Sequence, residues 1–314
     1  MRPPETWVAN IQQSGLSPTA AYYLWRGLAP AKRCNYDTPR ARFTLFCTLS
    51  NYRHLSGGCF PARATWLIER LCSLAVMVKV KTMKLYLAGI KSYQRDLGID
   101  CSAFGDPRLE RTIQGIKRDH SEPERRQRSP LIRPHLLSIL RHLQSCEYNN
   151  IVLRAAFTLA FAAFLRVGEF TYREVDKELG DSFARWYLTK RSIRVAGDGT
   201  NMELTIPASK TDPFRKGITI AIAATHDEGC PVRTMKQLQA NDHHRSPHAP
   251  LFCVGKHSQQ AFTREHVVQK LRQLATIAGL GQDKWNGHSF RRGAATWAAQ
   301  VGISEAEIQI LGRW

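Results

Sequence analysis

The stretch GHSFRRG at residues 287–293 lies near the end of a chain of 314 residues. It predicts the start of a helix on which His288 and Arg291, three residues apart, share one face. A histidine can donate to a phosphate oxygen or carry a proton, and an arginine neutralises the same group with two N–H bonds. Arg292 points away by about 100°. The alternative interpretation is a capping histidine beside a surface arginine.

A second unusual arginine, Arg166, lies in the string LRVGE at residues 165–169. It follows an apolar stretch, residues 151–165, which is too short to span a bilayer and predicts a buried helix. An arginine at the end of such a helix is costly unless it is paired or bound to a ligand. Glu169, one turn later, is the candidate ion-pair partner, and a phosphate is the candidate ligand.

A lysine between two predicted strands is the third candidate. Residues 202–206 and 217–223 alternate as strands, and a further strand is predicted over residues 186–195, which gives a small antiparallel meander. Lys210 lies in the connecting string SKTD, residues 209–212. A lysine in such a turn is usually solvated. If the hairpin folds over a substrate, Lys210 can instead protonate a leaving oxygen.

The charge of the chain points to a polyanionic partner. There are 45 Lys and Arg against 26 Asp and Glu, a net charge of +19. Nucleic acid is the usual partner of such a surplus, whereas the N-terminus has no signal-peptide core and no lipidation signal favours a membrane. Eight cysteines without CxxC spacing predict reduced thiols. We expect no metal, because the only cluster matches no familiar zinc spacing (Cys230, His243, His244, His248 and Cys253).

The organisation of the chain is predicted from its prolines and its helical periodicity. Residues 121–133 are proline-rich and charged, which indicates a linker between a helical domain, 1–120, and a second domain, 134–314. A predicted helix over residues 82–97 carries Lys84, Lys91 and Arg95 on one side. These three residues predict either a solvated face or a surface that follows DNA phosphates.

Together, the strings LRVGE, SKTD, GHSFRRGAATW and ILGRW resemble the catalytic domain of tyrosine recombinases, the phage-integrase-like family of site-specific DNA recombinases. The resemblance covers roughly residues 130–314. The string at residues 82–98 is similar to the family's helical core-binding, SAM-like domain. The motifs, including SKTDPFRKG and LGRW, are more similar to those of eukaryotic mobile-element recombinases than to those of compact bacterial ones. The resemblance implies a mainly α fold with a small antiparallel β-sheet.

The resemblance also implies a chemistry and its residues. A tyrosine attacks a phosphodiester and forms a 3′-phosphotyrosyl link, so no cofactor is needed. Arg166 and Arg291 would clamp the non-bridging oxygens, His288 would assist proton movement, and Lys210 would protonate the departing 5′-oxygen. Glu169 would support Arg166. The family usually has a His or Trp near a closing LGH-like motif. In the string ILGRW, Arg313 matches this closing position by register and Trp314 matches it by residue type, so both residues remain candidates.

Partners and location follow from the same resemblance. We expect duplex DNA as the partner, a homotetramer on DNA for the full-length protein, and no membrane. The location would be the nucleus if the source is eukaryotic and the cytoplasm otherwise, without secretion.

The nucleophile is the main departure from the family pattern. The family places its tyrosine about one helix beyond the position of Trp314, whereas Tyr172 and Tyr187 lie in the wrong part of the domain. We therefore expect a chain truncated before the nucleophile and inactive in cleavage. The alternative is a non-catalytic DNA-binding module, decayed or domesticated, that keeps the recombinase fold.

Overall fold

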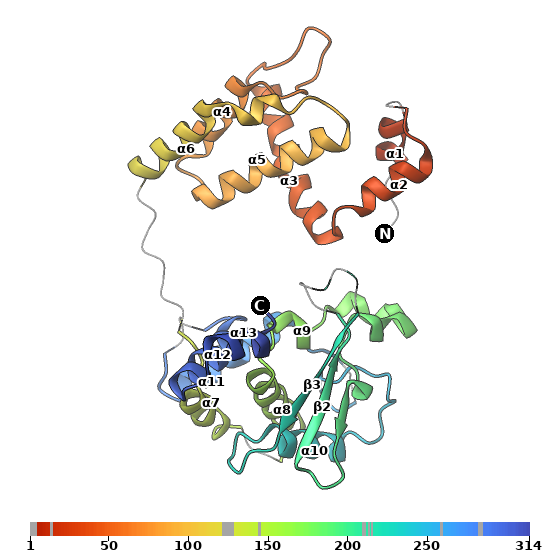
Figure 1. Cartoon of the computed structure of the whole chain (residues 1–314), viewed down its shortest axis with the longest axis vertical. Coiled ribbons are helices and arrows are strands. Elements are labelled where there is room, and N and C mark those ends of the chain that lie inside the picture. The colour runs from red at the N-terminus through yellow and green to blue at the C-terminus, as the bar shows by residue number, and fades with distance from the viewer. Residues whose placement is uncertain are drawn as a thin grey trace. The chain divides into compact units, whose positions relative to one another are not determined.

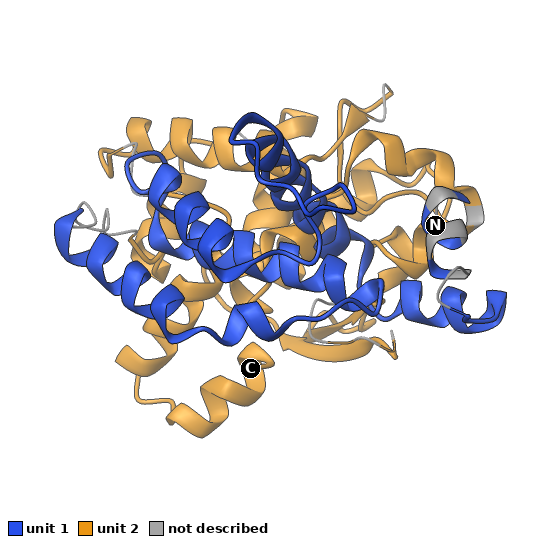
Figure 2. Cartoon of the chain, turned by 90° about the horizontal axis from the view of Figure 1, so that it is seen from above, with its two compact units in different colours: residues 1–125 blue, residues 126–314 orange. Residues whose placement is uncertain are grey.

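The chain folds as two compact units, Met1–Arg125 and Arg126–Trp314 (Figure 2). The computed structural model describes residues 5–12, 15–120, 129–143, 146–208, 212, 214, 216–257, 260–281 and 285–314. The division falls inside the segment predicted as the linker, residues 121–133. None of the described helices has the length and apolarity that crossing a membrane requires.

The first unit is helical in its described residues (Figure 1). Proline in the first turn starts three of the helices, where its missing N–H costs nothing. Gly89 lets two long helices approach, because a Cβ there would press on Pro39 at 3.0 Å. The helices are α1 Glu5–Gln12, α2 Pro18–Arg26, α3 Pro30–Leu49, α4 Ala64–Leu74, α5 Val80–Asp96, the 3-10 helix η1 Ser102–Gly105, and α6 Pro107–Asp119.

The second unit combines helices with a small sheet, which confirms the predicted fold class. Its helices are α7 Arg133–Leu140, α8 Tyr148–Ala162, α9 Val167–Phe170, α10 Pro231–Asn241, α11 Arg264–Ile277, α12 Ser289–Gln300 and α13 Glu305–Gly312, with the 3-10 helices η2 Glu174–Arg185 and η3 Lys190–Ser192. Its strands are β1 Ile193–Val195, β2 Asn201–Ile206, β3 Ile218–Ala223, β4 Cys253–Val254 and β5 Gln260–Ala261.

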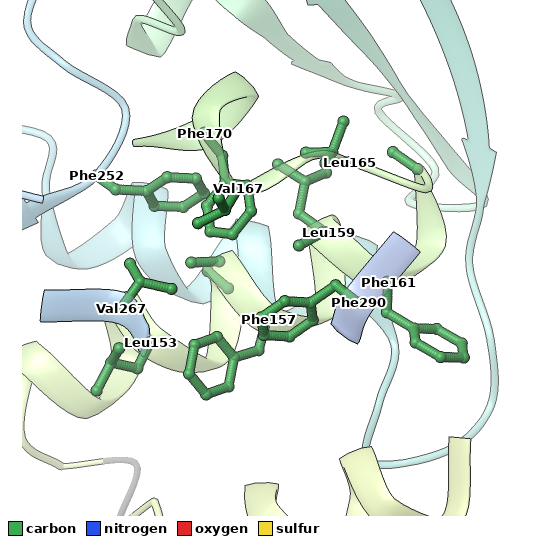
Figure 3. Packing of buried hydrophobic residues seen from close by; sticks show 14 of the residues in the cluster. Leu153, Phe157, Leu159, Phe161, Leu165, Val167, Phe170, Phe252, Val267 and Phe290 are labelled. Carbon is green, nitrogen blue, oxygen red and sulfur yellow. The ribbon is translucent and has the colours of Figure 1, made fainter. Parts of the chain in front are cut away.

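Helix α8 is the centre of this unit. It is buried on nearly every side, as its uninterrupted apolar sequence predicts. Phe157 packs against Phe290 of α12 with ring centroids 5.0 Å apart, and Phe170 of α9 contacts Phe290 at 6.0 Å (Figure 3). The two strings LRVGE and GHSFRRG are therefore joined through the same hydrophobic core.

The three-stranded sheet has the antiparallel order β1-β2-β3. In β2, Met202, Leu204 and Ile206 face the core and the intervening residues face solvent. The predicted strand over residues 186–195 is too long, because only residues 193–195 pair with β2. Lys190 and Arg191 instead donate their backbone N–H groups to Ala249 and Pro247, which holds the chain in a 3-10 turn.

Candidate anion site: a three-arginine cluster

Arg166 and Glu169 form a local unit at the end of α8. Phe164 has a φ of 51°, so the chain reverses there and Arg166 becomes the N-cap of α9. The carboxylate of Glu169 accepts the backbone N–H of Arg166 at 2.9 Å and its guanidinium Nη1 at 2.9 Å. The ion pair between Arg166 and Glu169 that the sequence suggests is therefore present. The Arg166 side chain keeps 20% of its surface exposed.

Helix α12 brings Arg291 to the same place. A Cβ on Gly287 would collide with Val167, and one on Gly293 would collide with the backbone of Leu131. These two glycines therefore let the GHSFRRG segment approach LRVGE and the first residues of the unit. Arg291 is buried and donates to the carbonyl oxygens of Phe164, at 3.0 Å, and Gly312.

The chain end supplies the third arginine. Arg313 adopts a left-handed conformation, with φ 56°, after α13. Its guanidinium donates to the carbonyl oxygen of Ala163 at 3.1 Å and to the second carboxylate oxygen of Glu169 at 2.9 Å. Trp314 is exposed, and its ring lies 4.7 Å from the Arg291 guanidinium carbon. Both candidates for the closing position thus lie at this site: Arg313 pairs with Glu169, and Trp314 lies against Arg291.

These four side chains, which we call the arginine cluster, carry three guanidinium groups and one carboxylate, Arg166, Arg291, Arg313 and Glu169. Burial, then repulsion from Arg166 and Arg313, lowers the pKa of Arg291 to about 10. Burial also lowers the pKa of Arg313. Among the described residues, the Nε atoms of Arg291 and Arg313 have no hydrogen-bond partner. The cluster therefore has spare positive charge and would be stabilised by an anion.

The remaining predicted catalytic residues are placed differently. His288 is exposed at the N-cap of α12, three residues before Arg291, and its backbone N–H donates to Asn286 Oδ1 at 2.8 Å. Lys210 lies outside the described residues. Arg264, an exposed arginine at the start of α11, lies beside Gly287 of the GHSFRRG segment. Its Nε lies 3.5 Å from where a Cβ on Gly287 would be, and no local pattern marks it.

In the first unit, the three predicted DNA-binding residues all lie on α5. Lys84 and Arg95 are exposed, as a phosphate contact requires. Lys91 is half-buried, and its Nζ lies 5.8 Å from the centre of the Phe104 ring. Only two of the three are therefore fully available to a partner.

The stretch with the clustered histidines and cysteines, residues 230–253, contains a buried ion pair. Asp242 and Arg245 are 2% and 1% exposed and pair directly. Tyr148 donates its hydroxyl to Asp242 at 3.1 Å, and Arg245 Nη1 lies 2.9 Å from Cys253 Sγ. No group of three or more metal-binding side chains occurs within the described ranges. We call these four residues the Asp242–Arg245 network; no local sequence pattern predicts it.

The tyrosine hydroxyls of the second unit are all engaged elsewhere. Tyr148 bonds Asp242, Tyr172 lies 3.5 Å from Cys253 Sγ, and Tyr187 donates to Asp176. Burial is the first cause of a raised pKa in all three, to about 12 for Tyr187. A phenol that is buried and hydrogen-bonded in this way is a poor nucleophile.

Comparison with known proteins shows the fold. No family model and no curated protein matches the sequence. Among solved structures, XerH site-specific recombinase bound to its difH substrate superposes with a TM-score of 0.56 at 16% identity, covering 88% of this chain and 72% of XerH. Lambda integrase, residues 75–356, bound to DNA gives 0.52 at 16% identity, covering 98% and 90%.

A lambda integrase tetramer bound to a Holliday junction gives a TM-score of 0.51, also at 16% identity, covering 98% of this chain and 75% of the integrase. The chain therefore has the tyrosine recombinase/integrase fold, as its motifs predict.

Proposed function

We propose that this chain binds duplex DNA as a site-specific recombinase or integrase does, and that the arginine cluster holds one phosphodiester. The observation that carries the proposal is that three arginines from separate segments come together. Arg166 and Arg313 both pair with Glu169, and Arg291 donates to the same Phe164 carbonyl as Arg313. The net charge of +19 supports a nucleic-acid partner. The similar solved structures are DNA complexes by their own descriptions.

The cluster suits the charge that develops during phosphoryl transfer. Arg166 is the most exposed of the three guanidinium groups and would meet the phosphate first. Arg291 is fixed by two carbonyl oxygens and covered by Trp314, so it needs little rearrangement to stabilise the transition state. In this proposal His288 moves a proton and Lys210 protonates the departing 5′-oxygen.

The nucleophile of the proposed reaction is a tyrosine that forms a 3′-phosphotyrosyl link. The hydroxyls of Tyr148, Tyr172 and Tyr187 are engaged away from the cluster. We therefore propose that residues 1–314 bind DNA without forming the covalent link themselves. A role in a mobile element, assembly as a tetramer on DNA, and a nuclear location if the source is eukaryotic belong to the same proposal.

Binding tests the role of the arginine cluster. Fluorescence anisotropy with a random-sequence duplex of about 30 base pairs would compare Arg166→Ala/Arg291→Ala with the wild type at several salt concentrations. We expect affinity to fall on the order of tenfold or more and the salt slope to decrease by up to about 2. The matched control is Arg141→Ala/Arg194→Ala. It removes two exposed arginines, each of which lies 3.6 Å from a glutamate.

Two outcomes would redirect the proposal. If the cluster variant binds as tightly as the wild type, phosphate contact lies elsewhere, and the non-catalytic module is the better description. If single-stranded RNA competes better than duplex DNA, the partner is RNA.

Cleavage is tested with a nicked suicide duplex and denaturing electrophoresis. We expect no protein–DNA adduct from residues 1–314. An adduct mapped to Tyr148, Tyr172 or Tyr187 would contradict the proposal that residues 1–314 do not form the covalent link.

A further inference from the structure

Two cysteines of the first unit lie side by side in its core. Cys47 is on the last turn of α3 and Cys59 is in the connection between α3 and α4; their exposed fractions are 1% and 6%. Both side chains belong to one core cluster and interact with each other, and Cys59 Sγ lies 3.9 Å from Thr44 Oγ1, one turn before Cys47 on α3. All eight cysteines of the chain are free thiols. This contact sets Cys47 and Cys59 apart from an isolated buried cysteine.

The chain around the two sulfur atoms is held in place by its own hydrogen bonds. Helix α3 ends where Asn51, with φ 56°, reverses the direction, and the Tyr52 N–H donates to the Cys47 carbonyl at 2.8 Å. The returning chain is fixed by the His54 N–H to the Gly58 carbonyl at 3.0 Å. The pairing of Cys47 with Cys59 is therefore a product of ordered local structure.

Aromatic packing anchors the same connection on both sides of Cys59. Tyr52 stacks on Trp66 of α4 with centroids 5.8 Å apart, and Phe60 packs on Phe43 of α3 at 5.8 Å. A bond between the two sulfur atoms would therefore join segments that are already in contact.

The two thiols differ in reactivity because of their surroundings. The hydrogen bond with Cys47 lowers the pKa of the Cys59 thiol, and so does the contact with Thr44 Oγ1 at 3.9 Å. Burial acts in the opposite direction, and the net result is a pKa of about 7. The hydrogen bond with Cys59 and burial both raise the pKa of the Cys47 thiol. The positive charge of Arg70 acts in the opposite direction and favours the lower pKa of Cys47. The thiolate is the form of cysteine that attacks peroxides.

We propose that Cys47 and Cys59 form a redox modification site that closes to a disulfide on exposure to a peroxide. The Cys59 thiolate attacks one peroxide oxygen, giving a sulfenic acid and hydroxide. The Cys47 thiol then displaces the sulfenic oxygen, which leaves as water, and the S–S bond forms. Two thiols are oxidised by two electrons and one peroxide is reduced. A thiol reductant restores the pair.

The wild-type chain gives the first test. The full chain is treated with hydrogen peroxide, unreacted thiols are alkylated after denaturation, and peptides are mapped by mass spectrometry without reduction. We expect a Cys47–Cys59 linked peptide, about 2 Da lighter than the sum of its thiols. We expect the apparent rate to rise roughly tenfold from pH 6 to pH 8, following the Cys59 thiolate. If both residues stay fully alkylatable while the exposed Cys34, Cys72 and Cys146 are oxidised, the proposal is wrong.

Two variants test the assigned order of the steps. In Cys47→Ser the sulfenic acid has no resolving thiol, so dimedone should label Cys59. In Cys59→Ser, dimedone should leave Cys47 unlabelled. Labelling of Cys47 and not Cys59 would overturn the assignment. Cys146→Ser, which changes an exposed cysteine of the second unit, is the control and should still form the linked peptide.

Discussion

Two buried arginine centres in the second unit differ in their charge balance. In the Asp242–Arg245 network one cation meets one carboxylate, and a tyrosine hydroxyl completes the set. Burial opposes the charge of Arg245, but the hydrogen bond with Asp242 still raises its pKa. The arginine cluster has three cations and one carboxylate; Glu169 pairs with Arg166 and Arg313, and the pKa of Arg291 is lowered to about 10. Removing one partner of the paired centre would leave an uncompensated buried charge, whereas the excess of arginines in the cluster leaves positive charge that an added anion would neutralise.

The largest expected effect comes from breaking the balanced centre. Arg245→Met leaves the Asp242 carboxylate buried without its cation, so we expect a loss of about 3–5 kcal/mol in the free energy of unfolding. Urea denaturation of the full chain measures it. The matched change in the other centre, Arg291→Met, should cost no more than about 1 kcal/mol, because it also relieves repulsion from Arg166 and Arg313. Equal losses in the two variants would remove the distinction.

Removing the shared carboxylate should have the next largest effect. Glu169→Gln leaves Arg166 and Arg313 without their counterion, and we expect a loss of about 2 kcal/mol in chloride buffer. The deficit should shrink in phosphate buffer of the same ionic strength, since phosphate would supply the missing negative charge. Glu203→Gln, which breaks an exposed 3.6 Å pair with Arg194, should change stability by less than about 0.5 kcal/mol in either buffer. A deficit that phosphate does not change would mean that the cluster has no access to anions.

Anion binding to the wild type should be smaller still. If phosphate occupies the cluster at a few times its dissociation constant, the gain is about 1 kcal/mol, visible as a higher Tm than in chloride at matched ionic strength. Arg166→Ala/Arg291→Ala should lose this gain, and Arg141→Ala/Arg194→Ala should keep it. The same gain in both double variants would indicate a general salt effect.

The smallest expected effect is a pH dependence. Because the pKa of Arg291 is lowered to about 10 in the folded chain and returns to its higher ordinary value on unfolding, the unfolded chain binds more protons between the two values. The charge of Arg291 therefore destabilises the fold below pH 10, and the cost is relieved as pH rises above it. Relative to Arg291→Met, the wild type should gain about 1 kcal/mol or less from pH 10 to pH 11, measured by urea denaturation. A constant difference would contradict the lowered pKa.

What could be foreseen from the sequence depended on the range of each interaction. The apolar run over residues 151–165 predicts a buried helix, which the structure has as α8. The three-residue spacing of Arg166 and Glu169 predicts their ion pair. In each case the interacting residues are neighbours in one helix or turn.

Contacts between distant segments had no such local pattern. The second contact of Glu169, with Arg313, joins residues 144 positions apart, and Tyr148 and Asp242 are 94 apart. The convergence of Arg166 with Arg291 was expected only from the motif resemblance. Strand β1 is shorter than the strand predicted over residues 186–195, because the residues before it form hydrogen bonds with the backbone of residues 247–249. Strand propensity alone does not reveal these bonds.

The close contact between Gly293 and Leu131 has a consequence for synthesis of the protein on the ribosome. Leu131 is completely buried, and its N–H donates to the Ser289 carbonyl at 3.1 Å. The first residues of the second unit therefore obtain their partners only after α12 has left the exit tunnel. Until then the core around α8 stays incomplete and open to chaperones, whereas the first unit, finished earlier, has all of its own core residues available.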